Sequence, residues 1–315
     1  MLNRRFLRIK AYQALYAQAQ SAGGSEAKIE KEMLLGVERT YDLFIHLMLL
    51  FGEMRHLAEA RMEERKVKRM PTAEDLVPNR RFVDNPVLVK LAESKRLLAE
   101  SETRKAGWVG ERDLLVPLFK VVTSSPEYVA YMAAESTTPA QDRALVVDLF
   151  VEHMAQFEGL HEHVEAKSIH WLEDLDLACS MVKRTIEQVR PEDADLQLVD
   201  SGAEAAEERE FLTTLYRATL ENRTGDEKLI ADRASNWEAE RIALSDMLLM
   251  RMALNEVRSF DQIPVKVTMN EYIEIAKAYS TPKSKNFING ILDKLFAEMK
   301  ESGTIHKVGR GLLES

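Results

Sequence analysis

The chain has 315 residues, of which 45% are hydrophobic and 30% are charged, and its formal net charge is −9 at pH 7. This length predicts about two globular units, and the composition is that of a folded protein rather than a disordered one. The longest apolar run, Leu43 to Phe51, is interrupted by His46 and is too short to cross a bilayer, so no membrane span is expected. The acidic balance excludes a broad basic surface that coats nucleic acid, so any RNA site must be local.

The N-terminus and the cysteine content predict a cytoplasmic protein. The first residues include Arg4, Arg5 and Arg8 and continue as an amphipathic stretch, without the apolar segment and cleavage site of a secretory signal. The single cysteine, Cys179, cannot form an internal disulfide or a cysteine-based zinc site, and its apolar surroundings predict a buried, inert thiol.

Helical periodicity runs through the whole chain, and no stretch alternates as a half-buried strand would, so we predict an all-α fold. In chain order the first helices are expected at Arg4–Gln20, 29–67, after 87, 114–122, 126–134, 139–163, 169–188 and 203–222. Prolines 71, 78 and 86 indicate an irregular connector. The acidic stretch after Pro191 predicts a linker.

The C-terminal third is the clearest part. Residues 240–258 are apolar on nearly every side, which predicts the buried central helix of its unit. Thr268 followed by Glu271 has the spacing of a capping box, so a helix is expected from there to Tyr279. Thr281, with Pro282 at the first helical position, is expected to cap a further helix.

A weak internal repeat is also visible. Leu149 precedes Trp171 by the same distance that Leu215 precedes Trp237, and methionines follow both tryptophans at equal spacing. A degenerate duplication and chance similarity between apolar helices both explain it.

Two basic segments are candidates for RNA contact. In the first helix, Arg4, Arg8, Tyr12 and Tyr16 recur every four residues and share one face, as a ridge contacting phosphates and bases would require. The alternative is a solvated basic start whose tyrosines pack inward.

The second segment lies near the C-terminus. Lys283, Phe287 and Lys294 share one face of the last predicted helix, opposite its apolar side, and a phenylalanine between lysines could stack on an unpaired base. The alternative is that Phe287 packs against a neighbouring helix.

An enzyme is the alternative of a different class. Glu53 with His56 and Glu158 with His161 form two Glu-x-x-His pairs on separate helices, as in di-iron carboxylate bundles. Such a site also needs one glutamate from each of two further helices. Glutamates are so frequent in this chain that candidates for these two positions can be found by chance. The sequence has no nucleophile triad order, P-loop, dinucleotide fingerprint or zinc spacing. We therefore expect a non-enzymatic protein without cofactor or metal.

Two stretches resemble a known family. The run RMALNEVRSFDQIPVKVTMNEYIEIAKAYSTPKSKNFINGILDK, from Arg251 to Lys294, is similar to the C-terminal half of NusB proteins, with their LR-x-A-x-x-E helix, IP-x-KV-x-x-NE segment and final FVNG-x-LDK helix. The start, NRRFLRIKAYQALYAQ, resembles that family's first helix. Together these cover the first twenty or so residues and those after Glu207.

The resemblance implies a helical, RNA-binding antitermination factor. Such a protein binds boxA-like ribosomal leader RNA with a NusE-type small-subunit ribosomal protein, within the transcription elongation complex. Ribosomal RNA maturation or assembly is an alternative role that uses the same contacts.

The resemblance also implies site residues. Arg4, Arg5 and Arg8 match the RNA-contacting cluster of the first helix, to whose face Tyr12 belongs. Tyr279, Lys283 and Phe287 match the RNA-facing loop and the start of the last helix. Lys294 is added to this set because it shares their helix face, not because of the resemblance. Asp246 matches an acidic residue at the ribosomal-protein interface. Lys283 departs from the family, many of whose members have an acidic residue there.

The resemblance divides the chain into four segments. The first helix of the core is expected at 1–24, the C-terminal core at 207–300 and a flexible tail at 301–315. Residues 25–206 are expected to be a helical insertion with no counterpart in compact members. If the internal repeat is a true duplication, the insertion is a degenerate extra copy of the core.

Overall fold

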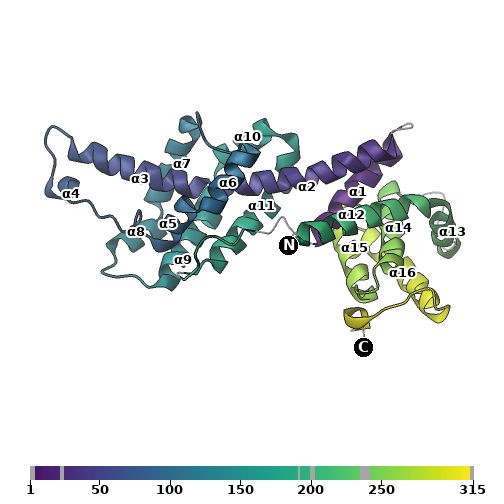
Figure 1. Cartoon of the computed structure of the whole chain (residues 1–315). Coiled ribbons are helices and arrows are strands. Elements are labelled where there is room, and N and C mark those ends of the chain that lie inside the picture. Colours follow the sequence, from purple (N-terminus) through teal and green to yellow (C-terminus); the bar gives the residue numbers. More distant parts are fainter. Residues whose placement is uncertain (1–3, 22–24, 191, 199–202, 235–241, 313–315) are drawn as a thin grey trace. The chain divides into compact units, whose positions relative to one another are not determined.

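The computed structural model describes residues 4–21, 25–190, 192–198, 203–234 and 242–312. Within these ranges the regular structure is helical, with no strand, so the predicted all-α fold is confirmed (Figure 1). None of the described helices is long and apolar enough to span a membrane.

The chain divides into two compact units. Unit 1 comprises residues 1–37 and 201–315, and unit 2 comprises residues 38–200. The first division falls inside helix α2 (Glu26–Met48), whereas the sequence placed the start of the insertion at residue 25. Helical periodicity could not reveal this division, because a helix that passes from one unit to another keeps its hydrogen-bond pattern.

Unit 1 is built around α14 (Leu244–Ser259), the predicted buried helix. It packs against five other helices, α1 (Arg4–Gln20), α12 (Ala203–Glu221), α13 (Arg223–Arg233), α15 (Val265–Tyr279) and α16 (Ser284–Glu301). Its fully buried side chains include Leu248, Met250, Leu254 and Val257, so apolar contacts surround it.

Two local expectations for unit 1 were wrong. Helix α15 begins at Val265, after Pro264, and not at the Thr268 capping box. Thr268 lies in the buried first turns and donates to Glu256, so its side chain is not available as a cap. Helix α13 was not predicted, because it is mostly polar and buries little beyond Asp226 and Ile230.

The C-terminal tail is held against unit 1. Lys307 Nζ donates to the backbone oxygens of Val257 (3.0 Å) and Phe260 (2.9 Å), at the end of α14. Ile305 is buried, and a short 3-10 helix follows at Gly309–Leu312. These contacts satisfy carbonyls that the end of α14 leaves free. The expectation of a flexible tail from 301 stays a prediction.

Unit 2 contains the rest of α2 and a succession of shorter helices. These are α3 (Leu50–Lys66), α4 (Ala73–Leu76), α5 (Pro86–Glu93), α6 (Lys95–Arg104), α7 (Arg112–Ser124), α8 (Pro126–Ala133), α9 (Pro139–Asp148), a π-helical turn (Leu149–Met154), α10 (Glu158–Lys167) and α11 (Ile169–Gln188). Asn85, Ser94, Ser125 and Thr138 cap four of them with side-chain oxygens. Each cap satisfies backbone N–H groups that the first helical turn leaves free.

Two helices expected to be long are interrupted. The helix predicted at 29–67 is divided at Leu49 into α2 and α3. The helix predicted at 139–163 ends in the π-helical turn, and α10 starts after an extended Phe157. Periodicity alone misses such breaks, since apolar spacing continues across them. The proposed repeat depends on Trp237, which lies outside the described residues, so it stays a prediction.

Candidate nucleic-acid interface

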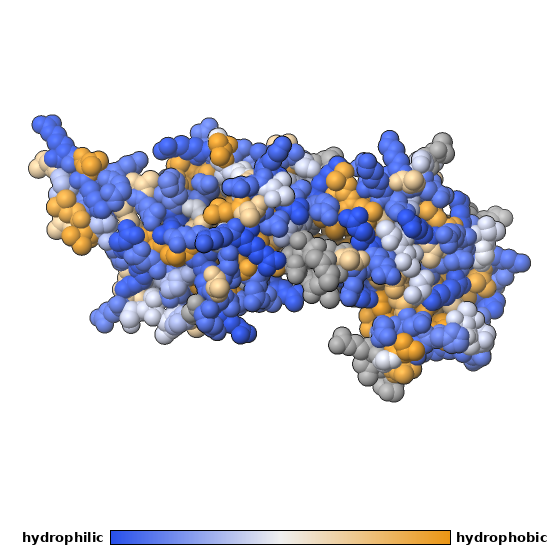
Figure 2. Space-filling model, in the orientation of Figure 1, coloured by the Kyte–Doolittle hydropathy of each residue, from blue (hydrophilic) through white to orange (hydrophobic). Residues whose placement is uncertain are grey.

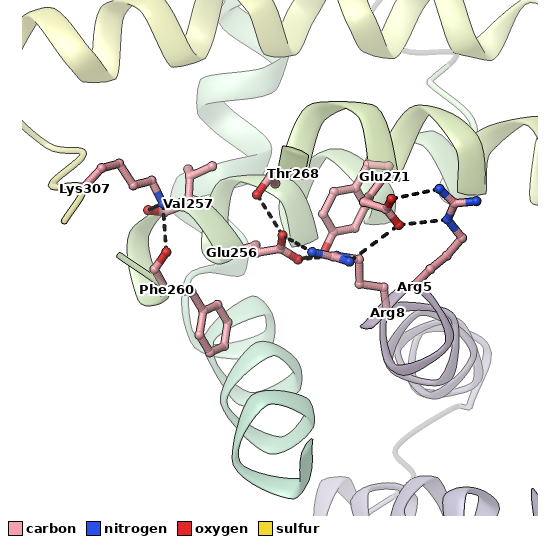
Figure 3. A network of polar contacts seen from close by, with 9 residues as sticks. Arg5, Arg8, Glu256, Val257, Phe260, Thr268, Glu271 and Lys307 are labelled. Carbon is pink, nitrogen blue, oxygen red and sulfur yellow. Dashed lines mark hydrogen bonds and ion pairs between the residues drawn. The ribbon is translucent and has the colours of Figure 1, made fainter. Parts of the chain in front are cut away.

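Arg8 of α1 is buried in an ion pair with Glu256 of α14. Its Nε and Nη2 atoms donate to the two carboxylate oxygens of Glu256, each at 2.7 Å, and the two side chains are 2% and 0% exposed (Figure 3). The same carboxylate accepts from Thr268 Oγ1 at 2.8 Å and from the Tyr272 hydroxyl at 3.0 Å. The four hydrogen bonds offset the cost of removing the Glu256 carboxylate from water, and they join α1, α14 and α15.

The electrostatics agree with this geometry. Burial opposes the charge on Arg8, but the hydrogen bonds and negative charge of Glu256 outweigh it and raise the pKa of Arg8 above its ordinary value. Burial raises the pKa of Tyr272 well above its ordinary value, so it stays a neutral donor. Arg8 is therefore charged and fully used inside the protein, which does not agree with the expectation that it contacts an RNA phosphate.

The other two arginines of the cluster are more accessible. Arg5 donates from Nε and Nη2 to Glu271 of α15, both at 2.8 Å, and its side chain is half-exposed. The hydrogen bonds from Arg5 lower the pKa of Glu271. Arg4 is exposed, and its guanidinium lies 5.2 Å from the centre of the Phe211 ring. Of the three arginines, Arg4 is the best placed to meet a phosphate.

Tyrosine rings connect the other end of α1 to the end of α15. Tyr12 is buried, donates to Ser245 Oγ at 2.9 Å and lies 5.3 Å, ring centre to ring centre, from Tyr279. Tyr16 is exposed, with its ring centre 6.0 Å from that of Tyr12. The inward-packing alternative thus holds for Tyr12, while Tyr16 and the half-buried Tyr279 remain accessible.

Asp246 lies at the head of α14, as predicted, but it is only 6% exposed. Its two carboxylate oxygens accept hydrogen bonds from the hydroxyl groups of Ser280 and Ser284, the latter at 2.8 Å. These serines flank the link between α15 and α16. The structure thus gives Asp246 a positioning role inside unit 1, which does not agree with direct contact to a ribosomal protein.

The start of α16 follows directly from this link. The helix begins at Ser284, whose hydroxyl lies 2.8 Å from that of Thr281, and not at Pro282 as expected. Lys283 and Lys294 are exposed, and so is Lys285. Phe287 is half-buried, between the two alternatives that the sequence left open. The RNA-contact role of these residues stays a prediction.

The structure therefore brings together one part of the predicted set. Tyr12, Tyr16 and Tyr279 form a continuous aromatic row, and the Asp246 hydrogen bonds position the link that carries Lys283. The burial of Arg8 had a sequence signal, because Arg8 lies beside Ala11 and Leu15 on the apolar face of its helix. Glu256 had a similar signal, as a carboxylate in the middle of a largely apolar helix.

The di-iron alternative gains no support from the residues that the structure describes. Among these, no three histidine, cysteine or carboxylate side chains group so as to hold a metal ion. His56 and Glu158 are exposed, and His161 Nε2 donates to the Ala155 backbone oxygen at 2.7 Å. Cys179 is half-buried rather than buried, and burial raises the pKa of its thiol to about 12, so the thiolate is disfavoured.

Comparison with known proteins identifies relatives of part of this chain. The NusB family model matches residues 172–297, and no solved structure matches the chain. The transcription antitermination protein NusB of Salinibacter ruber is 43% identical over 105 residues, which are 33% of this chain and 66% of that protein. The one of Chloroherpeton thalassium is 44% identical over 106 residues, 34% of this chain and 50% of that protein.

This chain thus spans between half and about two thirds of the length of those two relatives. The transcription antitermination protein NusB of Geobacter sulfurreducens is 38% identical over 109 residues, which are 35% of this chain and 79% of that protein. Identity at this level over most of a relative's length, on top of the family-model match, shows that the chain belongs to the NusB family.

Proposed function

We propose that this protein is a cytoplasmic, non-enzymatic transcription antitermination factor that binds RNA through unit 1. The observation that carries the proposal is its membership of the NusB family, with relatives named as transcription antitermination proteins. The RNA would be boxA-like ribosomal leader RNA. A NusE-type small-subunit ribosomal protein would bind beside it, within the transcription elongation complex.

The described residues support a particular RNA-facing surface. Lys283, Lys285 and Lys294 are exposed on or next to α16, where they could neutralise phosphates, and Phe287 is accessible enough for contact with a base. On α1, Arg4 is exposed, and Arg5 could contribute part of its guanidinium. Arg8 and Tyr12 would act indirectly, by fixing α1 against α14 and α15.

The partner proposal rests on charge. The net charge of −9 limits the RNA affinity of the chain alone, because its basic groups are confined to short segments. A ribosomal protein is normally basic, so docking one would add positive surface and tighten RNA binding through thermodynamic coupling. Since Asp246 is buried, it would support this interface by holding the α15–α16 link in place.

The test is fluorescence anisotropy of a labelled leader RNA containing boxA, compared with the same RNA carrying a permuted boxA, over a salt series. We expect tighter binding of the boxA RNA, and tighter still with the NusE-type protein added. Lys283→Ala and Lys294→Ala should each reduce the slope of log affinity against log salt by about 0.7, the value for one single-strand phosphate contact. Phe287→Ala should reduce affinity by about 1–3 kcal/mol if the ring stacks on a base.

Lys228→Ala is the matched control, because Lys228 is an exposed lysine of unit 1 on α13, outside this surface. Equal binding of the two RNAs, with unchanged slopes in both α16 variants, would remove the proposed surface. Crosslinking to cellular RNA distinguishes the alternative role. Reads concentrated in leader regions support antitermination, whereas reads across mature ribosomal RNA support a maturation or assembly factor.

A further inference from the structure

Unit 2 contains a large open groove between α3, α7 and α8. Its volume is about 700 Å³, within the range of ligand-binding sites. On α3 it is lined by Ala58, Arg61, Met62 and Arg65, whose spacing of three and four residues puts them on one face. The other lining residues come from three places in the chain. Helix α7 contributes Phe119, Lys120, Thr123 and Ser124, helix α8 contributes Tyr128 and Met132, and α4 with the segment that follows it contributes Glu74, Val77, Pro78 and Asn79.

The groove has an apolar floor and a positively charged rim. Arg61, Arg65 and Lys120 line it with a single carboxylate, Glu74, and Arg65 Nε also lies 4.0 Å from Asp75 just outside it. Among the described residues, the side chains of Arg61 and Lys120 have neither a hydrogen-bond nor an ion-pair partner, although both are exposed charges beside apolar surface. The positive charges of Arg61 and Arg65 also act on the Tyr128 hydroxyl, where they oppose the rise in its pKa that burial causes.

The basic and apolar character continues beyond the groove. Residues 61–70, at the end of α3, hold five basic and two acidic side chains. Val67, Met70 and Val77 are each more than 80% exposed, and Figure 2 shows orange atoms gathered at the end of unit 2 where α3 ends. Lys66 and Lys68 pair with Glu63 and Asp75, whereas Arg61 has no such partner. Isolated exposed apolar residues are ordinary, but a cluster of them beside an unpaired cation indicates an interaction site.

The walls of the groove are fixed by hydrogen bonds. Asn79 Nδ2 donates to the Met132 backbone oxygen at 2.8 Å, and Arg81 donates to several carbonyls at the end of α8. On the other side, Thr72 and Asp75 cap α4 reciprocally, and Lys68 donates to Asp75. The groove is therefore a property of the folded unit, and an occupant would find it already formed.

From these observations we propose that the groove binds an acidic amphipathic helix of a protein partner. The stretch from Ala58 to Arg65 is about 10 Å long at 1.5 Å per residue, which matches two turns of a docked helix. Apolar side chains at helical spacing would enter between Met62, Phe119 and Met132, because methionine adapts to partners of different shape. Carboxylates on the flanks of that helix would pair with Arg61, Arg65 and Lys120.

Single-stranded RNA fits the groove less well. Sequence-independent RNA binding uses aromatic faces on which bases stack. Phe119 is buried, and the half-buried Tyr128 ring packs edge-on against Phe82, with ring centres 5.1 Å apart. The accessible apolar groups are instead methionine and valine side chains, which suit aliphatic partners. This site is separate from the proposed RNA surface of unit 1, and its existence does not depend on RNA binding there.

The test is a display selection of 14-residue helical peptides on the full-length chain, followed by anisotropy measurements on the recovered peptides. We expect peptides with net negative charge and apolar residues at i, i+3 or i+4, and i+7. Arg61→Glu combined with Lys120→Glu should weaken their binding at least tenfold, and Arg61→Gln with Lys120→Gln should weaken it less. The matched control is Lys95→Glu with Arg184→Glu, two exposed cations of unit 2 outside the groove, which should leave binding unchanged.

Circular dichroism and thermal melts of each variant verify that unit 2 is folded. Three results would overturn the proposal. Selection could recover no peptide, or it could recover peptides without an acidic excess. The recovered peptides could also bind the Glu variant as tightly as wild type. A labelled 20-nucleotide oligouridylate that lost binding to the Glu variant while the peptides did not would assign the groove to RNA instead.

Discussion

The two units bury different kinds of polar group. In the core of unit 1, charged side chains from distant parts of the sequence meet, as Arg8 and Glu256 do. In unit 2 several buried polar groups are neutral helix caps, such as Asn85, Ser94 and Ser125, whose oxygens accept from backbone N–H groups two or three residues away. Asn85 in addition donates to the Tyr131 hydroxyl and to the Asp142 backbone oxygen. A cap stabilises one helix locally, whereas a buried ion pair fixes how several helices pack together.

A second buried network in unit 1 strengthens the contrast. Asp226 of α13 accepts from Asn255 Nδ2 and from Arg258 Nη1, each at 2.6 Å, and Arg251 Nη2 donates to the Thr219 backbone oxygen at 2.6 Å. These bonds join α12, α13 and α14. The helix packing of unit 1 thus depends on charge, and the surface proposed to bind RNA belongs to the same unit.

Unit 2 contains an aromatic and histidine cluster instead. The His46 ring stacks on Trp108 with ring centres 4.0 Å apart, and its Nε2 lies 3.3 Å from Nε2 of His163. His163 Nδ1 lies 3.4 Å from Glu111, which also pairs with Lys167 at 3.3 Å. Such a cluster packs like an apolar core only while His46 is neutral.

The largest expected effect breaks the charged core of unit 1. Glu256→Ala leaves the buried Arg8 charge uncompensated, so unit 1 should lose about 3–5 kcal/mol of stability. The combination Arg8→Met with Glu256→Leu should recover much of this loss, because no buried charge remains. Hydrogen exchange read by mass spectrometry resolves the effect by unit. Equal loss of protection in unit 2, or no recovery in the double variant, would contradict the contrast drawn between the units.

Lowering the pH should instead reduce the stability of unit 2. Burial, aided by the nearby His163 and Lys167 charges, lowers the pKa of His46 to about 3, while Glu111 opposes this only at His163. Because the folded-state pKa lies below the unfolded value, the stabilisation is complete above about pH 6.5 and is lost as pH falls towards 3. One proton gives a slope of about 1.4 kcal/mol per pH unit in that window.

Urea titrations from pH 7 to 4 on wild type and His46→Phe measure that slope. Phenylalanine keeps the ring against Trp108 but cannot take up a proton, so the variant should show a slope shallower by about one proton. Parallel curves for the two proteins would mean that His46 titrates normally, and the cluster would then not explain acid sensitivity.

A smaller effect is expected at Asp246. Asp246→Ala removes the charged acceptor of the Ser280 and Ser284 hydroxyl groups, which should cost about 1–3 kcal/mol because the buried Ser284 hydroxyl loses its bond to a carboxylate. Asp246→Asn, which keeps one acceptor oxygen, should cost less. Thermal melts measure both. If Asp246→Ala melts like wild type but loses partner binding, Asp246 is a contact residue after all, as the family resemblance implies.

The smallest effect is expected at the tail. Lys307→Met removes two hydrogen bonds to the last carbonyls of α14, which should cost about 1–2 kcal/mol and increase exchange in residues 303–312. Lys285→Met is the control, since that lysine is exposed and has no partner among the described residues. A tail that stays protected in the Lys307 variant would show that Ile305 burial alone holds it.

The sequence determined the helical class and many helix positions, because these depend on local patterns. Arg4–Gln20 and Ile169–Gln188 agree with the predicted bounds, and α14 is buried as its apolar composition indicates. The family could also be identified from the sequence, since the stretch from Arg251 to Lys294 contains the family's motifs in the same order. The breaks at Leu49 and Phe157 could not be predicted, because apolar spacing continues through them.

Only the tertiary structure decided which of the candidate residues face solvent. Arg4 and Arg8 recur on one face of the first helix, and the apolar neighbours of Arg8 are only a weak signal that it is buried. The structure shows that Arg8 pairs with Glu256 in the core while Arg4 is exposed, because the helices that pack against α1 decide which of its side chains are covered. The groove of unit 2 had no sequence signal for the same reason. Its cations come from α3 and α7, and Lys120 and Arg61 become one site only when folding brings those helices together.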